Sequence, residues 1–460
     1  MMMGAAGNGA KDGPSPFLAY DVRGKVGEQI TEELSFGLGL SFSNLFGPGP
    51  VVVGRDIRRS SGSLSASLID GLCAGGMDVL DIGLCGTEVV YFATSYLGAR
   101  GGIMVTASHN PKDYNGMKLV RERSVPISGE TGLFKLRDMI ALKSARRSTV
   151  EGRSKEADVT DAYISRVASF VHDRAALSSF KVATDPGNGC AGPFLDLLAE
   201  ELDLDLFRLN HDPNGDFPSG VPNPLLPEMR GPVSEAVRSS GADAGIAWDG
   251  DFDRCFLFDE NGAFTEGYYI VGLLAKKMLK GRSGEKVVHD TRLVWNTREI
   301  VIENNGIPLM NRTGHAFMKD RMRAEDAIYG GEMSAHHYFR DFYHCDTGMV
   351  PWLLVLETMA SEKRPLSKLL AERMERFPVS GELNRKVAEP EKALRRVEDA
   401  FRKGAVSIDH TDGVSMEHKD YRFNLRASNT EPLIRLNVET RGDPELLKET
   451  ARRVLDLIDL

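Results

Sequence analysis

Residues 102–111 read Gly-Ile-Met-Val-Thr-Ala-Ser-His-Asn-Pro, an apolar run that ends in a polar turn. The run 102–106 predicts a buried β-strand, and Ser108 follows it on a loop where backbone N–H groups surround its hydroxyl. Loops at strand ends are where α/β folds place their ligands. We therefore expect an α/β fold with a serine site here; a plain turn that caps the strand is the alternative.

Short apolar runs recur on both sides of this stretch and alternate with helical patterns, which is typical of α/β domains. The expected strands are 51–53, 117–120, 180–184, 245–248, 255–258 and 327–329. The last part of the chain differs. A helix at 391–403, strands at 413–417, 421–425 and 434–439, and a helix at 444–458 predict a smaller α+β domain.

Polar or proline-rich breaks divide the chain of 460 residues. The charged segment 143–158 predicts a linker, residues 249–253 end one α/β unit directly before a new strand, and 377–390, with Pro378, Gly381 and Pro390, predicts a third break. Residues 1–16, rich in glycine and alanine, are expected to be a disordered tail. We expect four domains, with bounds at 1–157, 158–258, 259–375 and 376–460.

Composition excludes several classes of protein. With 57 basic and 66 acidic residues the net charge is −9, which argues against a nucleic-acid binder. The longest uncharged stretch, 34–54, is broken by glycine, proline and serine, so no membrane span is expected. Five scattered cysteines without a CxxC pair argue against disulfides or structural zinc. We therefore expect a cytoplasmic protein in a reducing compartment.

A second motif, Asp249-Gly250-Asp251-Phe252-Asp253-Arg254, follows an apolar strand. Three carboxylates at this spacing repel one another unless a cation lies between them, and oxygen ligands favour Mg²⁺ or Ca²⁺ over zinc. An EF-hand loop fits poorly, because its sixth position would be Arg254 instead of glycine. An acidic surface turn remains the alternative.

Three further groups of residues are candidates, and each has an ordinary structural alternative. His109 and Lys118 lie beside the serine loop and are candidates for proton transfer. The turn 331–337 (GEMSAHH) carries short polar side chains suited to sugar hydroxyls. The turn 426–432 (RASNTEP), with Arg435 behind it, offers many donors and suits a phosphate. The alternative for 331–337 is a polar turn whose hydrogen bonds are satisfied within the protein. The alternative for 426–432 is a capped hairpin turn.

Taken together and in this order, the motifs resemble the α-D-phosphohexomutase family, and within it the bacterial phosphomannomutases. TASHNP is similar to the family's phosphoserine loop, DGDFDR to its magnesium loop, GEMSAHH to its sugar loop and RASNTEP to its phosphate loop. Residues 19–24 (AYDVRG) and 312–315 (RTGH) also match. Two positions depart from the family pattern. Leu18 stands where arginine or lysine is common, and Arg312 stands where lysine is common.

The resemblance implies four domains around a central cleft, three related α/β domains and a smaller α+β one. It implies that Ser108 carries a phosphoryl group and passes it to a hexose monophosphate through a hexose 1,6-bisphosphate, which is intermediate and activator. One Mg²⁺ would bind to Asp249, Asp251 and Asp253 and to the phosphorylated Ser108. The other implied catalytic residues are Tyr20, Arg23, His109, Lys118 and Arg254. Lys118 would act as a base if neighbouring cations lower its pKa.

The resemblance also implies the substrate. Glu332, Ser334, His336 and His315 would contact the sugar, and Arg426, Ser428, Asn429, Thr430 and Arg435 would hold the phosphate that is not transferred. Met333, where glucosamine-phosphate mutases have glutamine, resembles the mannose and mannose/glucose enzymes, and the run 336–342 (HHYFRDF) resembles phosphomannomutases that feed GDP-mannose synthesis. A dual mannose/glucose enzyme is the alternative. Hexose phosphates are the expected binding partners, and neither nucleic acid nor membrane is expected to bind. The expected oligomeric state is a monomer or a weak dimer.

Two other classes of function stay open. A serine-nucleophile metallophosphatase would release free phosphate, but it would need histidine ligands for a metal pair, and no such set is evident. A non-catalytic sugar-phosphate sensor would keep the phosphate loop but has no need of Ser108 together with three aspartates.

Overall fold

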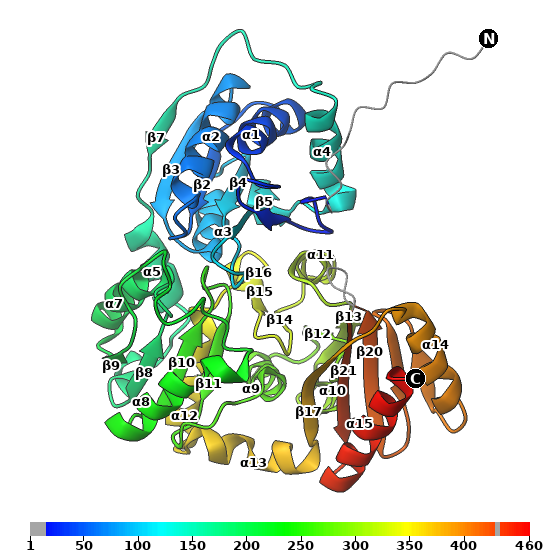
Figure 1. Cartoon of the computed structure of the whole chain (residues 1–460). Helices are drawn as coiled ribbons and strands as arrows, with labels where there is room; N and C mark the ends of the chain where they lie inside the picture. Colours follow the sequence, from blue (N-terminus) through cyan, green and yellow to red (C-terminus); the bar gives the residue numbers. More distant parts are fainter. Residues whose placement is uncertain (1–14, 428–432) are drawn as a thin grey trace, which may run out of the picture.

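The computed structural model describes residues 15–427 and 433–460, which form four sheets and the helices that cover them (Figure 1). Most of the expected tail 1–16 lies outside the described residues. Pro16 belongs to the folded part, because its carbonyl accepts a hydrogen bond from the Arg23 N–H at 2.7 Å. Among the described residues, no helix is both long enough and apolar enough to cross a membrane.

The first sheet has seven strands, and Ser108 lies on the loop that follows one of them, β4. Its order is β1 (Val22–Lys25), β5 (Tyr114–Arg121), β4 (Gly101–Val105), β2 (Val51–Arg55), β3 (Val79–Leu84) and β7 (Ser154–Glu156), with β6 (Val125–Pro126) beside β5. Helices α1 (Glu32–Phe46), α2 (Ser61–Ala74), α3 (Thr87–Tyr96) and α4 (Phe134–Ala141) accompany it. The expected linker 143–158 contains β7, which pairs in parallel with β3.

The second sheet carries the triple-aspartate loop. Its order is β11 (Cys255–Phe258), β10 (Ala244–Trp248), β8 (Lys181–Asp185) and β9 (Asp205–Arg208), with helices α5 (Thr160–Ala168), α6 (Arg174–Leu177), α7 (Ala191–Leu202) and α8 (Gly231–Ser240). Strands β10 and β11 pair antiparallel, so residues 249–254 form the loop of a hairpin between two buried strands.

The third sheet carries the turn 331–337. Its order is β13 (Ile307–Asn311), β12 (Lys286–Asp290), β14 (Tyr329–Gly331), β15 (His337–Phe339) and β16 (Cys345–Asp346). Helices α9 (Gly267–Leu279), α10 (Trp295–Glu303), α11 (His315–Glu325), α12 (Val350–Glu362) and α13 (Leu366–Arg376) accompany it. The strand expected at 327–329 lies at 329–331, because the backbone of Gly330 and Gly331 continues the pairing with β12 and β15.

The fourth sheet is entirely antiparallel, as the α+β expectation requires. Its order is β17 (Val379–Lys386), β21 (Leu433–Thr440), β20 (Tyr421–Ala427), β19 (Val414–Glu417) and β18 (Ser407–Asp409), covered by α14 (Pro390–Phe401) and α15 (Pro444–Ile458). The segment 377–390, predicted as a break between domains, contains β17, the first strand of this sheet. Gly381, with φ of +67°, lies where the pairing of β17 with β21 shifts register.

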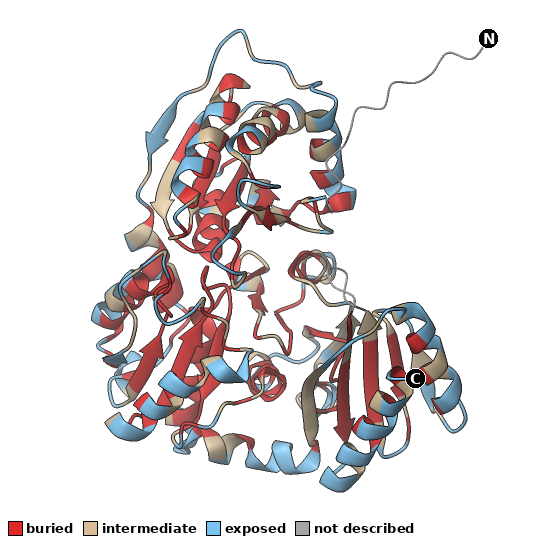
Figure 2. Ribbon diagram, viewed as in Figure 1, coloured by how far each residue is buried: buried red, intermediate tan, exposed pale blue. Residues whose placement is uncertain are grey.

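One apolar core runs through the first three units, whereas the fourth has a core of its own. Phe92 on α3, Tyr163 on α5, Trp248 on β10 and Trp352 on α12 belong to the shared core. The core of the last sheet is separate and includes Phe423 and Val438. Figure 2 shows the buried residues concentrated in the sheets and around the centre of the molecule. The fold class predicted from the sequence is confirmed.

Candidate active site

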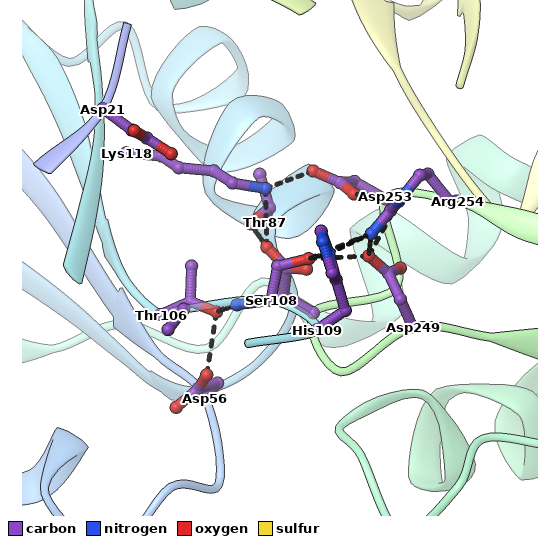
Figure 3. Close-up of polar contacts among 12 residues, drawn as sticks. Asp21, Asp56, Thr87, Thr106, Ser108, His109, Lys118, Asp249, Asp253 and Arg254 are labelled. Atoms are coloured by element: carbon purple, nitrogen blue, oxygen red, sulfur yellow. Dashed lines mark hydrogen bonds and ion pairs between the residues drawn. The ribbon is translucent and has the colours of Figure 1, made fainter. Parts of the chain in front are cut away.

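The loop after β4 is held in a strained shape that places the Ser108 hydroxyl beside the triple-aspartate loop. Ser108 has φ of +50°, a left-handed conformation that costs free energy for a residue other than glycine. Its N–H donates to Thr106 Oγ1 at 2.8 Å, and that hydroxyl donates to Asp56 at 2.8 Å (Figure 3). The Arg58 guanidinium donates to the Ser108 carbonyl at 2.7 Å. Sequence reasoning missed both Asp56 and Arg58, because no local pattern links residues 56–58 to the loop.

The Ser108 hydroxyl is buried and lies among three predicted site residues. It donates to Asp249 Oδ2 at 2.7 Å, lies 3.0 Å from His109 Nδ1, and accepts from Arg254 Nη2 at 3.3 Å (Figure 3). Burial, followed by the charge of Arg254, holds the pKa of His109 well below its ordinary value. His109 is therefore neutral, and its Nδ1 accepts from Arg254 Nη2 at 2.5 Å.

The hairpin loop 249–253 brings the three aspartates together. Their carboxylate oxygens lie within 4.8 Å of one another, and all three side chains are fully buried. One oxygen of each, Oδ1, has no hydrogen-bond partner among the described residues. Burial, and then the negative charge of Asp251, raise the pKa of Asp253 to about 6. These buried Oδ1 oxygens repel one another and receive no hydrogen bond from the described residues. They therefore fit as ligands of a hard divalent cation such as Mg²⁺.

Lys118 lies between two of these aspartates. Its Nζ is 2.7 Å from Asp251 Oδ2 and 2.5 Å from Asp253 Oδ2. Burial alone would lower the pKa of Lys118, but the two carboxylates raise it above its ordinary value. The nearest charges are anions and not cations, so these neighbours do not supply the lowered pKa that a lysine base needs, and the role of Lys118 as a base stays a prediction. In this arrangement Lys118 keeps its proton.

Two predicted residues near the N-terminus reach different parts of the site. Arg23 joins the serine loop, where it donates to Asn110 Oδ1 at 2.7 Å and forms an ion pair with Asp21 at 2.7 Å. Tyr20 instead packs edge-on against His315, with ring centroids 4.8 Å apart. Tyr20 therefore links the first unit to the third.

The turn 331–337 builds a polar wall of the third unit. Glu332 accepts from Tyr338 OH at 2.6 Å and from the Gly314 N–H at 3.0 Å. Ser334 Oγ accepts from Arg292 at 3.2 Å, and the same guanidinium lies 3.5 Å from Glu332. Sequence reasoning missed Arg292. Its position just past the end of β12, where α/β folds place ligand-binding residues, was the available signal.

His336 connects this turn to the metal loop, and His315 lies beside it. His336 Nδ1 is 3.0 Å from Asp346 Oδ2, and Asp346 Oδ1 accepts from the buried Lys319 at 2.8 Å. Burial lowers the pKa of His336, but Asp253 and then Asp346 raise it above its ordinary value overall. His315 has no hydrogen-bond partner on either ring nitrogen among the described residues. Its imidazole is thus available to a ligand.

The predicted phosphate cradle is described in part, since Ser428, Asn429 and Thr430 lie outside the described residues. Arg426 Nη2 donates to Glu382 Oε2 at 3.0 Å, and Arg435 Nη1 to Glu382 Oε1 at 3.3 Å. Arg426 Nη1 also donates to Thr313 Oγ1 at 3.0 Å, which joins the fourth unit to the third. Glu382 is a further site residue that the sequence did not reveal, because it lies on β17 inside the predicted break.

Family models match nearly the whole chain in four consecutive segments. They are described as phosphoglucomutase/phosphomannomutase alpha/beta/alpha domain I over residues 15–145, domain II over 161–262, domain III over 266–377 and the C-terminal domain over 382–457.

Individual relatives agree. The chain is 50% identical over 453 residues to a phosphomannomutase of Escherichia coli, which covers 96% of this chain and 98% of the relative. It is 51% identical over 444 residues to a protein of Xanthomonas campestris named phosphohexose mutases, covering 96% and 98%. A solved structure of a phosphoglucomutase/phosphomannomutase family protein from Burkholderia thailandensis is 31% identical, with a TM-score of 0.85 over 96% of this chain and 97% of that one.

A more distant solved structure has the same fold. It is an Aspergillus fumigatus N-acetylphosphoglucosamine mutase in complex with GlcNAc-6P and magnesium, 14% identical, with a TM-score of 0.60 over 96% of this chain and 95% of that one.

Proposed function

The chain belongs to the phosphoglucomutase/phosphomannomutase family, and we propose that it interconverts mannose 6-phosphate and mannose 1-phosphate with Ser108 as the phosphoryl carrier. The observation that carries this role is the contact of 2.7 Å between the Ser108 hydroxyl and Asp249. It places a strand-end serine directly at a buried cluster of three carboxylates that fits a divalent cation. The substrate class is supported by relatives named phosphomannomutases, which are 50% identical to this chain over 96% of its length.

The reaction divides into two phosphoryl transfers that balance. In the first, a sugar hydroxyl oxygen bonds to the phosphorus on Ser108, the bond from phosphorus to Ser108 Oγ breaks, and the hydroxyl proton passes in net terms to Ser108. The product is a hexose 1,6-bisphosphate. In the second, Ser108 Oγ bonds to the phosphorus of the other phosphate, the bond from that phosphorus to the sugar oxygen breaks, and the Ser108 proton passes in net terms to the sugar oxygen, which becomes a hydroxyl. Asp249 Oδ2 or the neutral His109 Nδ1 is placed to take up the Ser108 proton.

Charge neutralisation supports the transfer. Mg²⁺ bound to Asp249, Asp251 and Asp253 would neutralise the charge of the moving phosphoryl group. Arg254 lies 3.3 Å from Ser108 Oγ and supplies a fixed positive charge at the same point. Lys118 holds its proton against Asp251 and Asp253 and adds to the positive potential.

The remaining groups orient the sugar. Glu332 and Ser334, with His336 and His315 beside them, face the site from the third unit and are our proposed contacts to sugar hydroxyls. Arg426 and Arg435, together with Ser428, Asn429 and Thr430, which lie outside the described residues, are our proposed clamp for the phosphate that is not reacting. Holding that phosphate would let the bisphosphate present either end to Ser108. The four domain bounds, a cytoplasmic location and a role in GDP-mannose supply remain parts of this proposal.

A direct product assay tests the proposal. Mannose 1-phosphate should yield mannose 6-phosphate in the presence of Mg²⁺ and a trace of hexose 1,6-bisphosphate. Release of inorganic phosphate would instead indicate a phosphatase, and binding without turnover a sensor.

Dual specificity is the second candidate, favoured by the relative named phosphohexose mutases at 51% identity. The ratio of kcat/KM for mannose 1-phosphate to that for glucose 1-phosphate separates the two. We expect a ratio well above one, and equal values would establish the dual enzyme. A preference for glucosamine 6-phosphate would contradict both.

A further inference from the structure

Glu88, in the first turn of α3, is a buried carboxyl that the catalytic scheme does not use. An acidic residue in the first turn of a helix ordinarily faces solvent and complements the helix dipole. Glu88 instead has no exposed surface and points away from its own helix into the junction of three units. Its Oε1 accepts from Tyr163 OH of α5 at 2.5 Å and from Thr347 Oγ1 at 2.7 Å, and its Oε2 accepts from the Gly348 N–H at 2.5 Å.

The residues on either side of this carboxyl flank the metal loop. On one side, the neighbouring Thr87 donates its N–H to the Asp251 carbonyl at 3.0 Å and its hydroxyl to the Asp251 carboxylate. On the other side, the Gly348 carbonyl accepts from Trp248 Nε1 at 3.0 Å, and Trp248 directly precedes Asp249.

The backbone of Gly348 packs very closely against the loop 249–253. A Cβ at Gly348 would lie 2.4 Å from the Phe252 carbonyl oxygen, so only glycine fits there. The loop 249–253 therefore lies between α3 and residues 347–348, and the hydrogen bonds of the Glu88 side chain join these two segments to each other.

We propose that Glu88 is a positioning residue for the divalent-cation site. By tying Thr347 and Gly348 to α3, it closes a clamp around residues 249–253 and holds the three aspartates at the spacing that a cation requires. This inference rests on the proposed function insofar as the three aspartates bind the cation. It adds a residue 161 positions before the loop that touches neither the substrate nor the cation.

The hydrogen bonds around Thr347 explain why an amide cannot replace the carboxyl. Thr347 Oγ1 already accepts from the N–H groups of Met349 at 3.1 Å and Val350 at 3.3 Å, so its own proton must go to Glu88 Oε1. In Glu88→Gln, the NH₂ group must face either this hydroxyl or the Gly348 N–H, and both are donors. A buried donor left without an acceptor is destabilising. The same reasoning holds whether the carboxyl is ionised or neutral, since both contacts need acceptor oxygens.

Isothermal titration of the full chain with MgCl₂ tests the proposal without relying on turnover. Glu88→Gln should weaken the Kd for Mg²⁺ by tenfold or more. It should also lower kcat at limiting Mg²⁺, with recovery at high Mg²⁺ and a KM for mannose 1-phosphate within about threefold of wild type. Glu357→Gln is the matched control, because Glu357 also bonds two backbone N–H groups across a unit boundary, those of His172 and Asp173, but away from the metal loop. It should leave Mg²⁺ binding unchanged.

If Glu88→Gln does not fold, Thr347→Val and Thr347→Ser decide the question. The valine removes the hydroxyl and should weaken Mg²⁺ binding as Glu88→Gln does, whereas the serine keeps it and should match wild type. Equal Mg²⁺ affinity in wild type, Glu88→Gln and Thr347→Val would overturn the proposal. Failure of wild type to bind Mg²⁺ would instead overturn the assigned cation site, so the two failures are distinguishable.

Discussion

The Ser108 hydroxyl donates a hydrogen bond of 2.7 Å to Asp249 Oδ2, although the two residues lie 141 positions apart in the chain. Asp249 in turn accepts from Arg254 at 2.5 Å, and that guanidinium also reaches the serine oxygen. The proposed phosphoryl carrier, one proposed metal ligand and one fixed cation therefore form a single bonded group. Substitutions in any of them are expected to damage the same chemical step.

Replacing Ser108 with alanine should abolish mutase activity, because the other hydroxyl at the end of β4, that of Thr106, is bonded to Asp56 and to the Ser108 N–H. Intact-mass measurement of purified wild type should show a phosphate adduct on part of the sample, and Ser108→Ala should show none. Ser95→Ala is a suitable control, because Ser95 lies on α3 with its hydroxyl bonded to Ser124. Activity of Ser108→Ala near that of wild type would rule out the assignment.

Removal of divalent cation should stop turnover, and added Mg²⁺ should restore it. Asp251→Asn should have the same effect, because it removes negative charge from the cluster while keeping the size of the side chain. The exposed Asp216, paired with Arg59 at 2.6 Å, gives the control Asp216→Asn, which should keep full activity. Circular dichroism checks that both variants fold. Undiminished turnover in excess chelator would count against the cation site.

Arg426→Ala should lower kcat/KM by roughly 10- to 100-fold, since a hydrogen bond to a charged group contributes about 1.5–3 kcal/mol and about 1.4 kcal/mol is tenfold. Phosphate on Ser108 and Mg²⁺ binding should remain, because the cradle lies on a separate sheet. Arg385→Ala, on the exposed side of β17 in the same sheet, is the control. A variant that loses the phosphate on Ser108 would show that Arg426 acts elsewhere.

The fourth unit should close over the bound sugar, because it has its own core and touches the third unit through polar contacts such as Arg426 to Thr313. Small-angle scattering should show compaction of wild type on addition of a hexose 1,6-bisphosphate, and none for Arg426→Ala. Equal compaction of both proteins would argue against the cradle role.

Acid should destabilise the protein partly through His337. Burial, and then the neighbouring His336, lower the pKa of His337 to about 3, and its Nδ1 pairs with Tyr329 OH at 2.7 Å. The unfolded chain binds a proton near pH 6.5, so the contribution is complete above that pH and is lost as the pH falls toward 3.

Denaturant unfolding at pH 6.5 and pH 5 measures this contribution. At pH 6.5 the histidine of the unfolded chain is half protonated, so wild type should lose about 1.6 kcal/mol more than His337→Gln over that interval, at a slope that approaches about 1.4 kcal/mol per pH unit. His172→Gln, at a histidine whose side chain is 81% exposed, should behave as wild type. Identical losses in wild type and His337→Gln would refute the role of His337.

The sequence by itself determined the features that are local in the chain. Each strand followed by a polar loop, such as 102–111 and 245–254, is a continuous segment whose apolar run must be buried and whose polar residues must follow it. For that reason the fold class and the α+β character of the last domain could be predicted, and so could the choice of Ser108 and the three aspartates as candidates.

Only the tertiary structure decided which charges surround each candidate. Lys118 was expected among cations, but strand pairing and the hairpin at 249–253 place it between two carboxylates, which raises its pKa instead of lowering it. Glu88, Arg292 and Glu382 carry no motif, because their partners lie far away in the chain. A pKa and a hydrogen-bond network depend on distances of a few ångströms between segments, and those distances are determined by packing, not by any local pattern of residues.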